Sequence, residues 1–499
     1  MDFTLTSNDL YVLAPVITLC VGIAVVMLLD LFVPAPPARR RFVEIATFVF
    51  LAVALYLSLY QFGQEKAGPS DPKFLMGPLL GDVWNFRMHT VIGAVLIEGI
   101  TLITLLISTS FLSKEDEFYH GEYYTLLLTF ALGAIVMVSS KNLVLAILGL
   151  EIFSIALYVL VAARRRRTQA VEAGLKYFLL GAFASAFFLY GIALIYAGDG
   201  SITIPIIGQV GHEGVAGPEG LAAVGGAFLF GALFFKASVA PFHMWTPDVY
   251  EGAPTPITAL MSTGTKTAAF LLLTLCVKFI PLAILPLIPV LTILTIVVGN
   301  VGALQQTNLK RLLAYSGIAH AGYLMIGFSS LVLGAGQGTA YFSVRAMLFY
   351  LASYAVTNLA AFAVIGFLER KDSSTITLDG IRGLWKRNPM AAAVLALSAL
   401  SLAGIPPTAG FWAKFQIFST AIQTGLPVLA IIGILASIVG VYYYLKIVVY
   451  AFFLPAEDES PIEAQGIGAR IAIALMALAI LAVGLQPDLL LSPLTRIIL

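Results

Sequence analysis

Apolar residues in this sequence gather in runs of about 20, the length that an α-helix needs to cross a lipid bilayer. The runs are rich in Leu, Ala, Phe and Gly, and they lack the alternation with polar residues that marks the strands of a membrane β-barrel. We therefore predict about fourteen transmembrane helices, at residues 10–33, 43–62, 90–112, 122–139, 142–163, 170–197, 221–245, 255–279, 281–303, 311–333, 338–367, 391–420, 425–453 and 469–490.

Two of the predicted spans contain helix breakers beside a lysine. In the seventh span Pro241 follows Lys236, and in the twelfth span the breakers at 404–407 precede Lys414. Broken helices at membrane depth occur where the backbone is buried in protein or lines a water-filled cavity. Because the breaks lie five spans apart, they indicate two five-helix repeats of opposite orientation, spans 4–8 and 9–13. An ordinary proline kink in each span is the alternative.

The predicted fold class is an all-α polytopic membrane protein with two inverted repeats and broken helices 7 and 12. Its parts are an N-terminal three-helix segment (1–121), a first repeat (122–280), a second, inverted repeat (281–454) and a C-terminal helix (455–499). Composition agrees, because 60% of the residues are hydrophobic and 11% are charged, against about 25% charged in soluble domains. This balance, with a net charge of +1, excludes a soluble enzyme and a nucleic-acid partner.

Basic residues in the loops predict the orientation of the chain. Clusters of Arg and Lys lie at 39–41, 164–167, 310–311 and 370–387. With fourteen spans all four clusters fall on one face, which the positive-inside rule assigns to the cytoplasm. Both termini then lie outside, in the periplasm. The cluster at 164–167 is either an anchor of this topology or a binding site for anionic lipid.

Ionisable residues within the spans are expected to have a structural or functional role, because a charge at the bilayer centre costs about 2.5–3.5 kcal/mol. Glu98, Arg345 and Lys446 are weak candidates for function, because an interface or a partner helix accounts for each. We expect Glu151 of the fifth span to pair with Lys176 of the sixth. The stronger candidates are Glu151, Lys176, Lys236, Lys266, His320 and Lys414.

Six such groups would together cost nearly ~20 kcal/mol if each stood alone, more than the net stability of a typical fold. They must share water and partners, most simply along one polar track inside the bundle. A buried amine near a movable carboxylate can bind and release a proton, so the set is typical of a proton relay. Two alternatives stay open, namely ion pairs that only join helices and, for His320, an ordinary hydrogen-bonded core position.

Metal and redox chemistry find little support in the sequence. Cys20 and Cys276 lie in separate apolar runs, and the five histidines show no metal-binding spacing. We therefore expect neither a metal site nor a cofactor in this chain. Few acidic residues lie in the spans, which disfavours a metal-ion cage, although backbone and hydroxyl oxygens would suffice for sodium.

Three stretches resemble a known family. They are residues 236–256 (KASVAPFHMWTPDVYEGAPTP), 308–323 (NLKRLLAYSGIAHAGY) and 404–415 (GIPPTAGFWAKF). In these stretches, and in its span count, the chain resembles subunit N of bacterial NADH:quinone oxidoreductase, respiratory complex I, and its antiporter-like relatives. The related subunits usually carry Pro-Asp-Ala-His where this chain has Pro-Asp-Val-Tyr at 247–250.

The resemblance implies a role for each candidate residue. Glu151 and Lys236 match the paired glutamate and lysine of the first half-channel, Lys266 the central lysine and Lys414 the terminal lysine. Lys176 and His320 match further members of the family's polar axis.

The resemblance also implies a function that the residues alone do not supply. Quinone reduction in other subunits would drive protons through this one, making the chain a translocating subunit of an oxidoreductase. NADH, FMN, Fe–S clusters and quinone would bind in partner subunits. The expected partners are the antiporter-like subunit M, the small subunit K and the lipid of a bacterial cytoplasmic membrane. The alternative function is that of a subunit of a multisubunit Na⁺/H⁺ antiporter.

Overall fold

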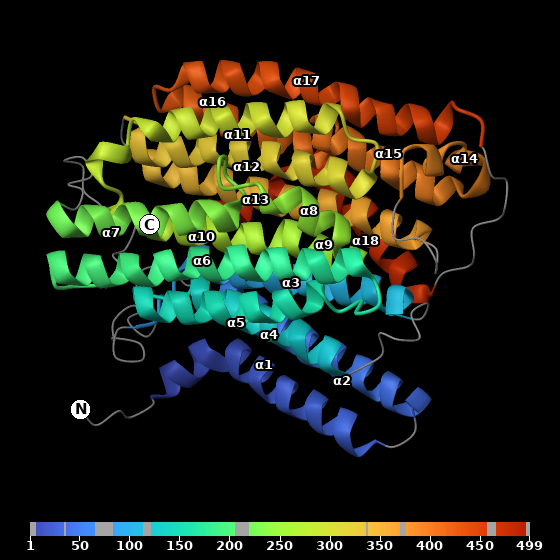
Figure 1. The fold of residues 1–499 in the computed structure, drawn as a ribbon, viewed down its shortest axis with the longest axis horizontal. Coiled ribbons are helices and arrows are strands. Elements are labelled where there is room, and N and C mark those ends of the chain that lie inside the picture. The colour runs from blue at the N-terminus through green and yellow to red at the C-terminus, as the bar shows by residue number, and fades with distance from the viewer. Residues whose placement is uncertain are drawn as a thin grey trace.

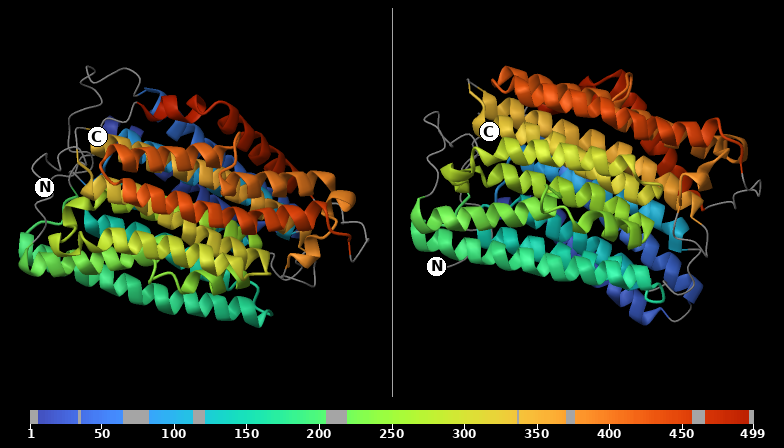
Figure 2. Two further views of the ribbon diagram at one scale, coloured as in Figure 1. Left: turned by 90° about the horizontal axis from the view of Figure 1, so that it is seen from above. Right: turned by 45° about the horizontal axis from the view of Figure 1, so that its top comes forward.

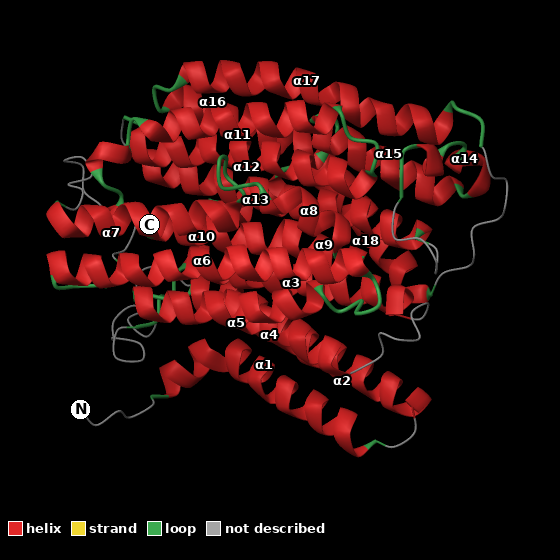
Figure 3. Cartoon of the chain, viewed as in Figure 1, coloured by secondary structure: helices red, strands yellow, loops and turns green. Residues whose placement is uncertain are grey.

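A computed structural model describes residues 6–33, 36–64, 83–112, 121–204, 219–335, 338–369, 376–456 and 466–495. Nearly all of these residues are helical (Figures 1 and 3). The long helices run roughly side by side, as the two further views show (Figure 2). Of the basic residues expected to set the orientation, Arg370 and Lys371 lie outside the described residues, and nothing is described of the Arg39 side chain.

The first half of the described chain forms α1 (Ser7–Phe32), α2 (Pro36–Gln64), α3 (Met88–Leu112), α4 (Gly121–Val138), α5 (Leu143–Val161), α6 (Thr168–Asp199), α7 (Gly220–Ala237), α8 (Trp245–Gly252), α9 (Thr255–Leu260), the π-helix η4 (Met261–Thr265) and α10 (Lys266–Leu275). The second half forms the 3₁₀ turns η5 (Val277–Phe279) and η6 (Leu282–Ile284), then α11 (Leu287–Leu304), α12 (Leu309–Leu333), α13 (Thr339–Leu368), η7 (Asp379–Ile381), α14 (Leu384–Arg387), α15 (Pro389–Ala403), α16 (Ala409–Gln423), α17 (Pro427–Phe452), α18 (Ile467–Leu485) and α19 (Asp488–Leu494).

Twelve helices among the described residues are long and apolar enough to cross a membrane. The other two predicted spans, the eighth and the twelfth, are divided into shorter helices. The eighth consists of α9, η4 and α10, and the twelfth of α15 and α16. The prediction of an all-α protein with about fourteen spans is therefore confirmed.

The breaks predicted in spans 7 and 12 are present. Helix α7 is followed by Ser238, which has the left-handed backbone angle φ 61°, and α8 begins at Trp245. Helix α15 is followed by Gly404, with φ 85°, and α16 begins at Ala409. A left-handed residue ends a helix because it turns the chain away from the helix axis. The π-helix within the eighth span is an irregularity that the sequence did not predict.

Packing follows the two predicted repeats. In the first repeat α4 packs on α5, α5 on α6, and α6 on both halves of the broken span, α7 and α8. In the second repeat α11 packs on α12, α12 on α13, and α13 on both halves of its broken span, α15 and α16. The two repeats meet where α12 contacts α8 and α13 contacts α9. The broken spans thus hold equivalent places in the two repeats.

Helices α12 and α13 form the centre of the bundle, and α1 and α2 form one edge (Figure 1). The most apolar windows of α12 and α13 are 83% and 89% buried, whereas those of α1 and α2 are each 28% buried. A helix that is apolar and buried all round lies inside a bundle, and one that is apolar but exposed faces lipid or another subunit. Any polar track therefore passes through α12 and α13.

Three of the basic clusters meet on one face, as predicted. Arg164, after α5, forms a 2.8 Å ion pair with Glu369 at the end of α13. Leu309 at the start of α12 donates a backbone hydrogen bond to Ile376, which lies within the last basic cluster. The side chain of Asn308 caps α12 by accepting from the backbone of Lys310.

The cluster at 164–167 does not act as one lipid-binding unit. The Arg164 and Glu369 side chains are each only 3% exposed, and the Arg164 guanidinium lies 4.4 Å from the centre of the Phe111 ring. Thr255, the first residue of α9, donates a 2.6 Å hydrogen bond to the same carboxylate. Only the neighbouring arginines, 165 and 166, are exposed. Arg164 therefore joins the two repeats from within.

Candidate functional site

Lys236 occupies the last turn of α7, just before the helix breaks. Its side chain is buried, and its Nζ donates a 2.8 Å hydrogen bond to Ser154 Oγ on α5. Aromatic ring faces attract a cation at this range. Three rings lie 5.2 to 5.4 Å from Nζ, those of Phe153, Tyr158 and Tyr177.

Glu151 lies one turn before Ser154 in α5. Its Oε1 is buried without a hydrogen-bond partner. The carboxylate is close enough to Lys236 to act on the amine electrostatically. No direct ion pair joins the two side chains, because the amine bonds to the Ser154 hydroxyl instead. The structure thus places the carboxylate near the amine without a direct bond between them.

Lys176 does not pair with Glu151, so that prediction is wrong. The Lys176 side chain is 44% exposed on α6, and its Nζ contacts Glu172 at 2.7 Å and Asp248 at 3.1 Å. Arg311 Nη1 contacts the other oxygen of Asp248 at 2.7 Å. Counting residues along a span gives the depth of a side chain but not its direction around the helix. The structure places Lys176 outside the buried set.

Lys266 is the first residue of α10, directly after the π-helix η4. Its side chain is 1% exposed, and its Nζ has no hydrogen-bond partner. The rings of Tyr250 and Tyr354 lie 5.8 and 5.9 Å from Nζ. Helix α12 approaches at Gly317, where a Cβ atom would lie 3.0 Å from the amine. A buried amine without protein acceptors is costly unless water or a proton acceptor joins it.

Lys414 lies on α16, after the break in span 12. Its Nζ donates hydrogen bonds to the Ala403 carbonyl at 2.8 Å and to Ser437 Oγ at 2.7 Å. The Ala403 carbonyl belongs to the last turn of α15, which is followed by Gly404. Carbonyls in a last helical turn have no partner within their helix. The break therefore supplies an acceptor for Lys414.

His320, on α12, uses both ring nitrogens. Nδ1 lies 2.7 Å from the Tyr350 hydroxyl, and Nε2 lies 3.1 Å from the Tyr444 hydroxyl. The Tyr444 hydroxyl also lies 2.5 Å from Ser316 Oγ. A neutral imidazole donates at one nitrogen and accepts at the other. Tautomer exchange would therefore pass a proton along the network when the tyrosine that gives up its proton takes another from a neighbour and the tyrosine that receives one passes its own on. His320 is thus part of a polar network and not an isolated core residue.

Aromatic side chains join Lys236 to Lys266. The Tyr177 ring, beside Lys236, stacks on Trp245 with 4.8 Å between ring centres. Trp245 lies edge-on to Tyr250 at 6.2 Å, and Tyr250 faces Lys266. The broken span contributes to this link, because Trp245 and Tyr250 both lie on α8.

A second chain of contacts joins Lys266 to Lys414. The Tyr354 ring, beside Lys266, lies 4.9 Å from the His320 ring, and His320 leads to Tyr444 as described above. The Tyr444 and Tyr443 rings are 4.4 Å apart. The last steps are hydrogen bonds from Tyr443 Oη to Asn300 at 3.1 Å and from Asn300 to Tyr323 at 3.3 Å, and the Tyr323 ring lies 5.2 Å from Lys414 Nζ.

We call this arrangement the lysine row: Glu151, Lys236, Lys266, His320 and Lys414 with the tyrosines between them. The sequence predicts the ionisable members of the row but not the tyrosines. A usable signal was present, because Tyr350 and Tyr354 lie four residues apart within a span and therefore on one helix face.

The weaker candidates lie elsewhere. Arg345 is partly exposed beside the Tyr341 ring, and Lys446 is partly exposed beside Tyr450. Glu98 is fully buried on α3. Within the described part of the chain, no three His, Cys, Asp or Glu side chains gather as they would around a metal ion.

The family model described as NADH:quinone oxidoreductase/Mrp antiporter, TM, matches residues 140–440, which include both broken spans. NADH-quinone oxidoreductase subunit N of Trichlorobacter lovleyi is 38% identical over 490 residues, 97% of this chain and 96% of the relative. The subunit N of Chloroflexus aggregans is 37% identical with the same coverage. The chain belongs to the subunit N family.

Solved structures agree with this membership. A chain of respiratory complex I from Thermus thermophilus with bound aureothin is 35% identical, with a TM-score of 0.79 over 97% of this chain and 99% of that one. A chain of the Mrp complex from a Dietzia species shares the fold with a TM-score of 0.77 at 22% identity, covering 98% and 96% of the two chains. The subunit N family thus shares an antiporter-like fold, and this member is a multi-pass membrane protein.

Proposed function

We propose that this chain translocates protons along the lysine row, as the membrane subunit N of an NADH:quinone oxidoreductase. The observation that carries the proposal is the row itself, in which three buried lysines are joined by tyrosines and a histidine across both repeats. Lysines at this depth are costly for the fold, and none of the three forms an ion pair within the described residues. A purely structural role would favour paired charges.

Movement of the Glu151 carboxylate would start the transfer. When the carboxylate approaches Lys236 it stabilises the protonated amine, and when it withdraws the amine releases its proton toward Lys266. Lys266 has no protein hydrogen bond to break, so it can receive and pass on a proton without rearranging its neighbours. Lys414, held by Ala403 and Ser437, would form the terminal site.

The energy needed is within reach of such a site. Moving one charge against 100 mV costs about 2.3 kcal/mol. One unit of pKa corresponds to about 1.36 kcal/mol, so a change of about 1.7 units at one amine would suffice. Shifts of that size are ordinary when a carboxylate moves beside a buried amine.

The proposal places the chain in a multisubunit complex. Subunits M and K would be its neighbours, and the exposed apolar faces of the outer helices would meet them or lipid. NADH, FMN, Fe–S clusters and quinone would bind to other subunits, whose redox chemistry supplies the energy. The complex would lie in a bacterial cytoplasmic membrane, with the face that carries Arg164 and Arg311 in the cytoplasm and both termini in the periplasm.

Proton pumping by the assembled complex tests the proposal. Inverted membrane vesicles that carry K236A, K266A or K414A would be given NADH, and acidification would be followed by quenching of a pH-sensitive dye. We expect each variant to lose pumping. The matched control is K278A, because Lys278 is exposed on η5 just beyond α10. Assembly would be checked on a native gel stained for NADH dehydrogenase activity.

Each outcome separates the alternatives. Normal pumping by K266A in an assembled complex would refute the row. A small, inactive band for the unaltered chain on the native gel would remove the redox drive, and gradient-driven Na⁺/H⁺ exchange in vesicles would then support the antiporter alternative. Loss of assembly without loss of pumping per complex would support a purely structural role for the lysines.

A further inference from the structure

A buried carboxyl group lies outside both repeats. Glu98 is ten residues into α3, about 15 Å along the helix axis from its start. Its side chain is completely buried, and neither carboxyl oxygen has a hydrogen-bond partner. The Ser58 hydroxyl on α2 lies near the carboxyl and is also without a hydrogen bond. Two polar groups from neighbouring helices therefore face each other without satisfying each other.

Such a group needs an explanation. An isolated carboxylate in apolar surroundings costs far more than a hydrogen-bonded one, and within the described residues no cation forms an ion pair with Glu98. A buried acid that makes no hydrogen bond also adds no polar link between the helices. A neutral carboxyl group that exchanges its proton with water accounts for both the missing ion pair and the missing hydrogen bonds.

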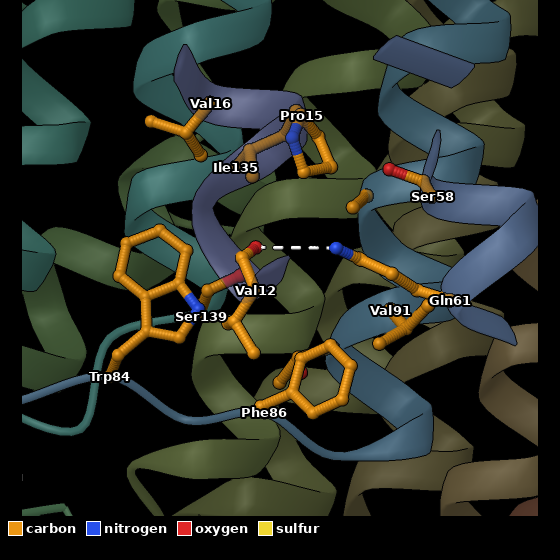
Figure 4. Close-up of a pocket in the computed structure, with 12 residues that line it drawn as sticks. Val12, Pro15, Val16, Ser58, Gln61, Trp84, Phe86, Val91, Ile135 and Ser139 are labelled. Atoms are coloured by element: carbon orange, nitrogen blue, oxygen red, sulfur yellow. Dashed lines mark hydrogen bonds between the residues drawn. The ribbon is translucent and has the colours of Figure 1, made fainter. Parts of the chain in front are cut away.

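A small cavity is lined in part by Ser58. It has a volume of about 20 Å³ and lies between α1, α2, α3 and α4 (Figure 4). A single water needs about 10–15 Å³ and two to four polar partners. Ser58, Gln61, Thr90 and Ser139 supply polar groups to the wall. Ser58 thus lines the cavity and also lies near Glu98.

The sequence explains why helix α1 leaves this space. Pro15 lies inside α1, and proline has no backbone N–H with which to bond the carbonyl four residues earlier, that of Tyr11. Gln61 Nε2 on α2 donates to that carbonyl at 2.7 Å. It also donates to the Val12 carbonyl at 3.4 Å, the bond drawn in Figure 4. Helix α1 bends in this region (Figure 1). Pro15 itself lines the cavity.

The cavity lies toward one end of α3. Trp84 and Phe86, which precede the helix, form part of its wall, together with Val91 and Ala94. Ala94 lies one helical turn before Glu98, so the cavity occupies the side of Glu98 that leads to the start of α3. Water in the cavity would therefore lie between the carboxyl and the face at which α1 and α3 begin.

We propose that Glu98 is a proton-binding site that exchanges its proton with water in this cavity. The site is separate from the lysine row, because it lies on the three N-terminal helices. It does not depend on the function proposed above, since a carboxyl can bind a proton whether or not the row translocates one. The ligand is a proton delivered by water, and Ser58 is the group that orients that water toward the carboxyl.

Infrared difference spectroscopy of the purified complex tests this proposal. The carbonyl stretch of a protonated carboxyl is separate from the bands of carboxylates and amides. We expect E98Q to remove one such band and S58A to shift it. The matched control is E122Q, because Glu122 is an exposed carboxyl at the start of α4 and its loss should leave the band in place. Transfer into deuterium oxide should shift the band promptly in the unaltered complex.

Filling the cavity tests the route. Ala94→Leu adds three carbon atoms to the wall of the cavity, so we expect the band to remain but its deuterium shift to become slower. A band that E98Q leaves unchanged would overturn the proposal, because Glu98 would then be ionised. An A94L band that exchanges as fast as the unaltered one would overturn the cavity as the route.

Discussion

Lys266 and Lys414 give the sharpest test of the lysine row, because their replacement by Met should change stability in opposite directions. Methionine has nearly the shape of lysine but no amine. Lys266 Nζ has no hydrogen-bond partner, so K266M removes a buried polar group that nothing satisfies. Such a group costs about 1–3 kcal/mol, and more when charged. We therefore expect K266M to stabilise the fold by roughly that amount.

K414M should have the reverse effect. It removes the amine that donates to the Ala403 carbonyl at 2.8 Å and to Ser437 Oγ at 2.7 Å. The Ala403 carbonyl then keeps only the long 3.5 Å hydrogen bond from Ser437 Oγ, and the loss of the short one should cost about 1–3 kcal/mol. Equilibrium unfolding in mixed detergent–SDS micelles measures both changes, and NADH-driven acidification of vesicles measures pumping. Both variants should lose pumping.

The combination separates function from stability. If K266M destabilises the protein as much as K414M does, Lys266 Nζ must have hydrogen-bond partners, which would refute its description as an unsatisfied amine. If either variant pumps normally, that lysine does not belong to the proton route. A stabilised variant that cannot pump is the expected result for Lys266, because a residue kept at a cost to the fold serves another purpose.

Three further predictions follow from other parts of the structure. E369A should lower the free energy of unfolding by about 3–5 kcal/mol in the same assay, because it leaves Arg164 buried without its ion pair. The control D379A breaks an exposed pair and should lower it by less than about 1 kcal/mol. Equal losses would contradict the argument from burial. K176Q should lower stability by less than about 1 kcal/mol, an effect that high salt removes, because its pairs are exposed; a large, salt-independent loss would place Lys176 inside the bundle. G317V should impair pumping, because even a Cβ atom at this position would lie 3.0 Å from Lys266 Nζ. NADH oxidation by the assembled complex is measured in the same samples. Normal pumping would show that the amine can move aside.

The spans, the two breaks and the buried lysines could be predicted from the sequence because each depends on local properties. Apolar runs report the spans, Pro241 and Gly404 report the breaks, and Lys266 is conspicuous because a charge at that depth is expensive. The position of Lys176 could not be predicted in this way. Its direction depends on how α6 is rotated against α8, which is a property of packing and not of sequence spacing.

The links between the lysines were beyond reach for a related reason. Trp245 and Tyr250 lie close together in the sequence, but their contact with Tyr177 depends on the docking of α8 against α6. The ion pair between Arg164 and Glu369 joins residues 205 positions apart. An arginine in a loop indicates topology when only the sequence is known, and the packed structure shows that Arg164 makes a buried contact.

The π-helix before Lys266 has a consequence for how this site arose and how it can be altered. A π-helical turn holds more residues than an α-helical turn and breaks the regular phase of the helix. Each residue turns an α-helix by about 100°. The number of residues in 261–265 therefore decides which neighbours the Lys266 amine meets. Deleting one of them would keep the lysine and every partner in the chain, yet rotate the amine away from Tyr250, Tyr354 and Gly317. The place of Lys266 in the lysine row thus depends on how many residues segment 261–265 contains as much as on which residues they are. A single insertion or deletion in this segment could create or abolish the central site.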